Sequence, residues 1–138
     1  MPQRTSEATW EGDLQSGNGS MVVGDGVYEG AYTFASRFEQ GEGTNPEELI
    51  GAAHAGCFAM ALSNELAEDG YEPSRVHATA TVHLEDGEIT KIALTVEADV
   101  PGIDEDTFLS FAEGAKENCP VSQALAAVPE ITLEAALS

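Results

Sequence analysis

The chain has 138 residues, a length typical of a single domain, and can bury roughly two-thirds of its unfolded surface. It carries 25 acidic and five basic residues, a formal net charge of -20. This balance argues against nucleic acid and anionic membranes as partners, because both attract clustered Lys and Arg. Disorder is disfavoured too, since 42% of the residues are hydrophobic.

Two interpretations of the acidic residues are open. They form a solvated surface, as in proteins from a salt-rich cytoplasm, or they form a surface for a cationic partner. In either case salt screens the repulsion among carboxylates, so we expect stability to rise with NaCl.

The N-terminal residues 1–7 contain no apolar core, and no apolar run approaches the ~20 residues that span a bilayer. The two cysteines, Cys57 and Cys119, form no CxxC pair and indicate no disulfide framework. We therefore expect a cytoplasmic protein without a membrane partner.

Turn signals and apolar periodicity predict two halves of similar plan. The first half has expected strands over 8–14, 20–23 and 32–34, a loop over 36–43, and a helix from 46 to about 69 that Gly70 ends. The second half has expected strands over 75–84 and 89–96 around an Asp86-Gly87 hairpin, helices over 103–118 and 121–127, and a strand over 131–135. The prediction is one α+β domain over 1–138, with two three-stranded antiparallel halves around long central helices.

The helix that begins at residue 46 dominates the sequence. Thr44 or Asn45 can cap its N-terminus, and a proline and two glutamates suit its first turn. Over residues 49–62 almost nothing is polar except His54 and Cys57. A helix that is apolar on nearly every face is buried on nearly every face, and three short strands cannot cover it. We therefore expect an intertwined homodimer in which a second subunit covers the remaining face.

Cys57 lies too far into this helix for the macrodipole to lower its pKa. In apolar surroundings its thiol is expected to be less acidic than usual and unreactive. Cys57 is therefore either a small core residue or a thiol to which the fold brings a cation. Arg37, just before the helix, could hold the thiolate and polarise an oxygen-bearing substrate, although it could equally be a surface arginine.

Glu47 is a candidate partner for Arg37, since a buried guanidinium needs a charged partner. Its alternative role is to support the helix dipole. Glu47 and Cys57 lie about 15 Å apart along the helix axis, which one arginine cannot comfortably span. We therefore expect Arg37 and Glu47 of one subunit to serve Cys57 of the other.

Cys119 stands at a helix end before Pro120, where the backbone can move. A mobile thiol suits a resolving role, in which it attacks a sulfenic acid on Cys57 and yields a disulfide. The alternative is a buried capping residue. His54 lies one turn before Cys57 and could be a base, although a hydrogen-bonded core histidine is the simpler interpretation.

Residues 43–63 resemble the signature of the OsmC branch of the OsmC/Ohr peroxidases. Supporting segments lie at 10–12, 36–39, 89–94, 100–103 and 118–122, so the resemblance covers nearly the whole chain. It implies an OsmC-like homodimer that reduces organic hydroperoxides with thiols, without metal, haem or other cofactor. On this resemblance Cys57 is the peroxidatic thiol, Cys119 the resolving thiol, Arg37 the activating cation and Glu47 its partner.

The resemblance also implies a dithiol reductant, either small or a lipoylated protein. Phe58, Met60 and Phe111 are expected to line an apolar pocket that favours organic peroxides. Two other classes stay open. The chain could be a module in which His54, Cys57 and Cys119 hold a soft metal, or a non-enzymatic, stress-induced dimeric protein with passive thiols.

Overall fold

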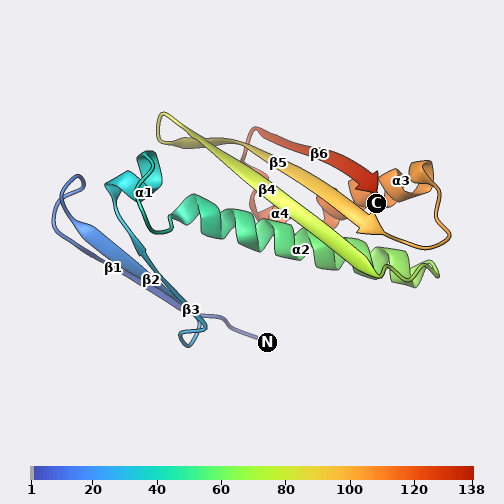
Figure 1. Cartoon of the computed structure of the whole chain (residues 1–138), viewed down its shortest axis with the longest axis horizontal. Helices are drawn as coiled ribbons and strands as arrows, with labels where there is room; N and C mark the ends of the chain where they lie inside the picture. The colour runs from blue at the N-terminus through green and yellow to red at the C-terminus, as the bar shows by residue number, and fades with distance from the viewer. Residues whose placement is uncertain (1) are drawn as a thin grey trace. The chain divides into compact units, whose positions relative to one another are not determined.

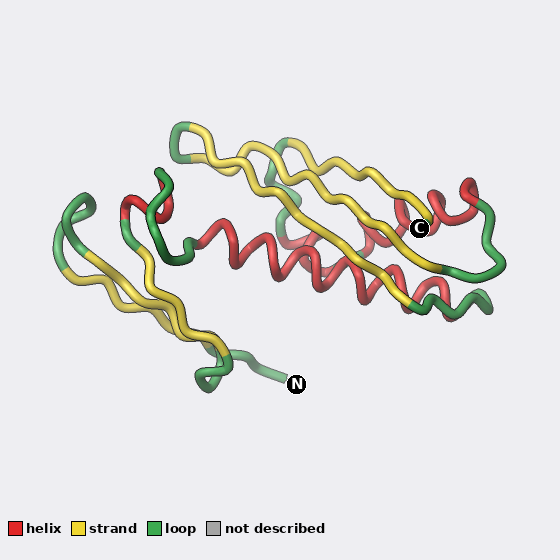
Figure 2. The backbone as a smooth tube through the Cα atoms, in the orientation of Figure 1, coloured by secondary structure: helices red, strands yellow, loops and turns green. Residues whose placement is uncertain are grey.

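The computed structural model describes residues 2–138, which form two compact units that divide between residues 49 and 50. Figure 1 shows the order of the elements along the chain, and Figure 2 separates helices from strands. The two units are described in turn. Within residues 2–138, no helix is both long enough and apolar enough to cross a membrane.

The first unit contains a three-stranded antiparallel sheet in the order β1-β2-β3. The strands are β1 (Ser6–Glu11), β2 (Asn18–Val23) and β3 (Tyr28–Tyr32). Gly19 of β2 pairs with Trp10 on one side and with Tyr32 on the other. A Cβ at this position would lie 2.6 Å from the Trp10 ring, so only glycine lets the two rings meet across the sheet, with centroids 5.4 Å apart.

The chain then forms a short helix, α1 (Phe34–Phe38), where the end of a strand over 32–34 and the start of a loop over 36–43 were predicted. The prediction was wrong because five residues are too few to show a helical period. The local signal is instead a capping box. The Thr33 side chain accepts from the backbone of Ser36, and the Ser36 hydroxyl accepts from the backbone of Thr33.

The long helix, α2 (Pro46–Glu68), is confirmed, and its first four residues belong to the first unit. Asn45 caps it by accepting from the Glu48 N–H at 2.8 Å. Its end is also as expected, because Gly70 adopts φ 92, a left-handed conformation that glycine reaches without strain.

The second unit holds the rest of α2 and a sheet in the order β4-β5-β6. Strands β4 (Arg75–Glu85) and β5 (Glu88–Asp99) are antiparallel, and a two-residue turn at Asp86 and Gly87 joins them. Both turn residues have positive φ, 50 and 79, as a type I′ turn requires. The predicted hairpin is confirmed.

Strand β6 (Glu130–Leu137) runs parallel to β5, so this sheet is mixed and not wholly antiparallel as predicted. The connection from β5 to β6 contains α3 (Glu105–Asn118) and α4 (Pro120–Ala124). A helical crossover of this length returns the chain to the end of the sheet at which β5 begins, so the next strand runs parallel to β5. The local sequence pattern of a strand does not reveal this direction.

The core of the second unit lies between one face of the sheet and helices α2 and α3 (Figure 1). Along β4 partly buried and exposed residues alternate strictly, so one face of that strand faces the helices. Gly51 lets α2 approach β4 closely, because a Cβ there would lie 3.2 Å from the Ala80 carbonyl oxygen. The buried apolar residues of α2, β5 and α3 are Phe58, Leu62, Leu66, Ile92, Leu94, Val96, Ala98, Phe108, Ala112 and Ala115.

Helix α2 is not covered on all sides within this chain. Ala52, Ala53, Gly56 and Met60 are exposed, and Met60 is 76% exposed. The spacing of residues 52, 56 and 60 places them on one stripe of the helix. The second unit by itself therefore leaves an apolar face of α2 uncovered.

Candidate active site

The first unit holds Arg37 and Glu47 in place through a hydrogen-bonded link between α1 and the start of α2. The Ser36 hydroxyl donates to the Thr44 carbonyl at 2.8 Å, and the Asn45 amide donates to the Ser36 carbonyl at 2.9 Å. Ser36, Thr44 and Asn45 are all buried. This link fixes the last turn of α1, which carries Arg37, against the first turn of α2, which carries Glu47.

Arg37 and Glu47 form a bidentate ion pair, so the pairing expected from the sequence is present. Arg37 Nε donates to Glu47 Oε1 at 3.0 Å and Nη2 donates to Oε2 at 2.9 Å. The Glu47 side chain is 10% exposed and that of Arg37 is 36% exposed. The hydrogen bonds that Arg37 donates to Glu47 raise the pKa of Arg37, so the guanidinium stays charged. A paired yet accessible guanidinium suits recognition of a polar oxygen or a thiolate.

An aromatic cavity adjoins this guanidinium within the first unit. Arg37 lies over the Phe38 ring, with Cζ 5.3 Å from its centroid. The cavity has a volume of about 230 Å³ and is lined by Trp10, Leu14, Tyr32, Thr33, Phe34, Arg37 and Phe38. Its chemistry combines one cation with an aromatic wall, which fits a small organic molecule that has a polar end.

The two thiols belong to the second unit, where the side chain of Cys57 of α2 lies against that of Cys119. Both are free cysteines; Cys57 is partly buried and Cys119 is fully buried. Cys119 is the junction of α3 and α4, and its backbone, with φ -58 and ψ 127, is not helical. Two reduced thiols in contact, one of them accessible, can form a disulfide after the accessible one is oxidised.

The surroundings of Cys57 within this chain do not favour its thiolate. Burial raises the pKa of the Cys57 thiol, and so does the adjacent Cys119 side chain, while the Val121 backbone N–H that faces it acts in the opposite direction. The sequence-based expectation that this thiol is less acidic than usual agrees with these contacts. A reactive Cys57 therefore needs a positive group from elsewhere.

His54 is fully buried and its Nε2 lies 2.7 Å from the Ser122 hydroxyl. Burial lowers the pKa of His54, so the imidazole is neutral near pH 7. This is the hydrogen-bonded core histidine that the sequence favoured. Ser122 was not identified from the sequence, although its spacing contained a signal: His54 lies three residues before Cys57, and Ser122 lies three residues after Cys119.

The structure thus brings the four predicted site residues together as two pairs. Arg37 contacts Glu47 in the first unit, and Cys57 contacts Cys119 in the second. Phe58 is fully buried in the core, whereas Met60 is largely exposed on α2.

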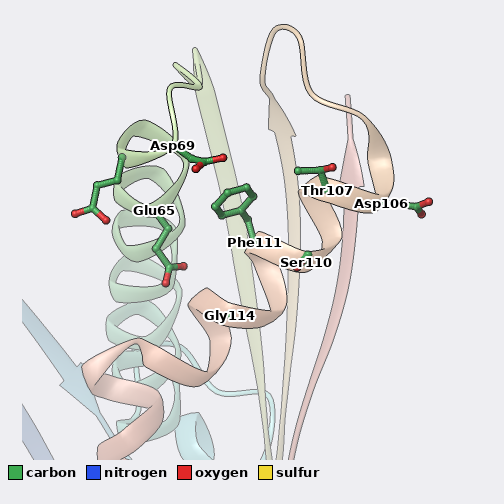
Figure 3. Close-up of a pocket in the computed structure, with 8 residues that line it drawn as sticks. Glu65, Asp69, Asp106, Thr107, Ser110, Phe111 and Gly114 are labelled. Carbon is green, nitrogen blue, oxygen red and sulfur yellow. The ribbon is translucent and has the colours of Figure 1, made fainter.

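A separate cleft of about 570 Å³ lies between the C-terminal part of α2 and helix α3 (Figure 3). The Phe111 ring projects from α3 toward Glu65, near the end of α2, and Asp69, just beyond it. The cleft is lined by Glu65, Glu68, Asp69, Asp106, Thr107, Ser110, Phe111 and Gly114. Neither thiol lines it, and its four carboxylates repel anions.

Comparison with known proteins identifies the class that this fold and thiol pair define. The family model described as "OsmC-like protein" matches residues 39–134. The chain belongs to this family. The resemblance inferred from the sequence and the OsmC-like α+β fold are thereby confirmed.

Among individual proteins, the chain is 50% identical to "Peroxiredoxin OsmC" of Escherichia coli over 136 residues, which cover 95% of this chain and 94% of that protein. It is 28% identical to "Organic hydroperoxide resistance protein-like 1" of Staphylococcus saprophyticus, with 87% and 88% covered. The crystal structure of an OsmC-like protein from Mycoplasma pneumoniae superposes with a TM-score of 0.76 at 14% identity, covering 99% of this chain and 97% of that one.

Proposed function

We propose that residues 1–138 act as one peroxidase domain that reduces organic hydroperoxides to alcohols with its two thiols. The observation that carries the proposal is the proximity of two free thiols, the partly buried Cys57 and the buried Cys119. It is supported by the names of two relatives, a peroxiredoxin and an organic hydroperoxide resistance protein-like protein.

The proposed reaction has three steps. The Cys57 thiolate attacks the distal oxygen of ROOH; the O–O bond breaks, the alkoxide takes a proton and leaves as alcohol, and Cys57 becomes a sulfenic acid. The Cys119 sulfur then attacks the Cys57 sulfur, which forms the disulfide and releases water. An external dithiol, small or lipoyl-bound, reduces this disulfide by exchange and restores both thiols.

The cation that the first step needs is proposed to come from a second subunit. The contacts of Cys57 within its own chain raise the pKa of its thiol. Glu47, which binds Arg37, lies about 15 Å from Cys57 along the axis of α2, a distance that one arginine cannot comfortably span. The exposed apolar stripe of α2 supports a homodimer, because a second copy of the chain would remove it from water.

The aromatic cavity beside Arg37 supports the choice of an organic substrate. Its wall would hold the alkyl or aryl group of the peroxide, while the guanidinium polarises the peroxide oxygens and stabilises the charge that develops on them. Hydrogen peroxide has no group for this wall and is expected to react more slowly.

The second candidate is a non-enzymatic dimeric protein with passive thiols. The raised pKa of Cys57 favours it, since an un-ionised thiol does not attack peroxide.

The experiment that separates the two candidates is mass spectrometry after one equivalent of an aryl hydroperoxide. We expect wild type to consume the peroxide and to show a Cys57–Cys119 bridge. Cys57→Ser should consume none, and Cys119→Ser should stop at a sulfenic acid that a dimedone-type reagent traps. Two unmodified thiols in wild type would contradict the peroxidase proposal and support the non-enzymatic protein with passive thiols.

Subunit mixing tests whether Arg37 serves the other subunit. Arg37→Ala and Cys57→Ser should each be inactive alone. After they are mixed in equal amounts and subunits exchange, half of the dimers are mixed, and each has one complete site. We therefore expect about a quarter of wild-type activity. If Arg37 served Cys57 of its own chain, no complete site could form and the mixture would stay inactive.

A further inference from the structure

His54 and Ser122 are two buried polar residues that the proposed reaction does not use. His54 is fully buried and Ser122 is 7% exposed. Their side chains meet at 2.7 Å, between helix α2 and the short helix α4. This buried hydrogen bond joins α2, which carries Cys57, to α4, which begins directly after Cys119.

The hydrogen bond between His54 and Ser122 lies next to the thiol pair along both segments. Along α2, His54 is one turn before Cys57; beyond the helix junction, Ser122 is three residues after Cys119. Between them the Val121 N–H faces the Cys57 thiol and lowers its pKa, against the larger effect of burial. The segment 119–122 therefore contacts α2 through the thiols, through one backbone N–H and through the His54–Ser122 hydrogen bond.

The geometry also indicates which hydrogen atom forms the bond. His54 Nδ1 is buried and has no hydrogen-bond partner among residues 2–138. A buried N–H without an acceptor is rarer and costlier than a bare lone pair. The tautomer with its proton on Nε2 avoids that cost, so Nε2–H donates to the Ser122 oxygen. Ser122 is then the one hydrogen-bond partner of the imidazole among residues 2–138.

The backbone hydrogen bonds of Cys119 stay within its own segment: its N–H donates to the Ala115 carbonyl at 3.0 Å, and its carbonyl accepts from the Gln123 N–H at 3.1 Å. Pro120 lacks an N–H, Cys119 has a non-helical backbone, and α4 has only five residues. The His54–Ser122 hydrogen bond joins this segment to α2. We propose that His54 and Ser122 are a positioning pair that holds Cys119 against Cys57 for disulfide formation.

The inference rests on the proposed function, in which Cys119 resolves a Cys57 sulfenic acid. In that step the S–S bond forms, the S–O bond breaks and the hydroxyl leaves as water with the thiol proton. Attack on the peroxide itself needs only Cys57, whose place α2 sets. The pair should therefore affect the second step and leave the first unchanged.

The test uses an aromatic disulfide reagent, which drives the same ring closure without peroxide. The reagent first forms a mixed disulfide with the accessible Cys57 and releases one equivalent of aromatic thiolate. Cys119 then attacks the Cys57 sulfur and releases the second equivalent. We expect Ser122→Ala to slow the second phase roughly threefold to tenfold, the range that one net hydrogen bond sets. The first phase should stay within about twofold of wild type.

The matched control is Ser110→Ala, an exposed serine in α3, which should leave both phases unchanged. If Ser122→Ala unfolds because it leaves His54 unpaired, the double variant His54→Leu, Ser122→Ala removes both polar groups and should fold. It too should be slow in the second phase. A wild-type second phase in a folded variant would overturn the positioning role.

Treatment of the same variants with an aryl hydroperoxide separates this inference from the proposed function. In the first turnover of Ser122→Ala, alcohol release should keep its wild-type rate while the sulfenic acid accumulates. If wild type consumes no peroxide but Ser122→Ala still closes slowly with the aromatic reagent, the peroxidase proposal fails and the positioning role stands. If wild type is a peroxidase and closure is unchanged in the variant, only the positioning role fails.

Discussion

At the scale of single residues, the proposed reaction depends on the ionisation of one thiol. The contacts of Cys57 in its own chain favour the neutral form, because burial and the adjacent Cys119 side chain outweigh the Val121 N–H. Arg37 is a charged, anchored and partly accessible cation. The sequence identified both residues. The residues that hold them in place, Ser36 for Arg37 and Ser122 for Cys119, were not predicted, because a buried serine has no sequence pattern of its own.

His54 links the folding equilibrium to pH. Burial lowers the pKa of His54 from its ordinary value of 6.5, so the unfolded chain binds this proton at a higher pH than the folded chain does. The free energy of unfolding should therefore fall as pH is lowered through 6.5, and this contribution should level off below the folded pKa. Its slope is at most about 1.4 kcal/mol per pH unit.

Chemical denaturation of wild type and His54→Gln between neutral and mildly acidic pH measures this contribution. The variant should lose that part of the pH dependence. His77→Gln, at an exposed position on β4, is the matched control and should keep the wild-type slope. Identical slopes for wild type and His54→Gln would contradict the linkage.

At the scale of elements, α2 was the most predictable part of the chain. Its cap, its length and its end at Gly70 are all local signals, and the β4–β5 hairpin follows from Asp86 and Gly87 in the same way. Helix α1 and the direction of β6 were missed. The first is too short for a period, and the second depends on how α3 and α4 return the chain to the sheet.

The junction of α1 and α2 depends on Asn45. Its side chain accepts from the Glu48 N–H and donates to the Ser36 carbonyl, so it both caps α2 and holds α1. Asn45→Ala should cost about 2 kcal/mol of stability, since it removes a helix cap and a buried hydrogen bond.

Denaturant titration measures this loss, with Asn64→Ala as the matched control. Asn64 is exposed on α2 and makes one long hydrogen bond of 3.4 Å, so its removal should change little. Peroxidase activity of Asn45→Ala should also fall, because the Arg37–Glu47 pair loses its support. Equal stability of the two variants would show that the cap is dispensable.

At the scale of the whole molecule, the net charge of -20 sets the response to salt. Like charges repel in the compact state, and the screening length falls from about 10 Å at 0.1 M salt to about 3 Å at 1 M. The Tm should therefore rise between these NaCl concentrations. Neutralising the exposed Glu7, Glu29 and Glu134 with Gln should weaken the rise. Equal Tm values for wild type in low and molar salt would contradict the screening argument.

The features that the sequence by itself determined are those that depend on local interactions. The helical register of α2, the hairpin turn, the acidic composition and the identities of both thiols and of the Arg37–Glu47 pair depend on residues close in sequence or on residue chemistry alone. Tertiary structure decided the parallel placement of β6, the contact of Cys57 with Cys119 and the hydrogen bond of His54 with Ser122. These contacts join residues more than 30 positions apart, and only the packing of helices on a sheet determines which distant side chains meet.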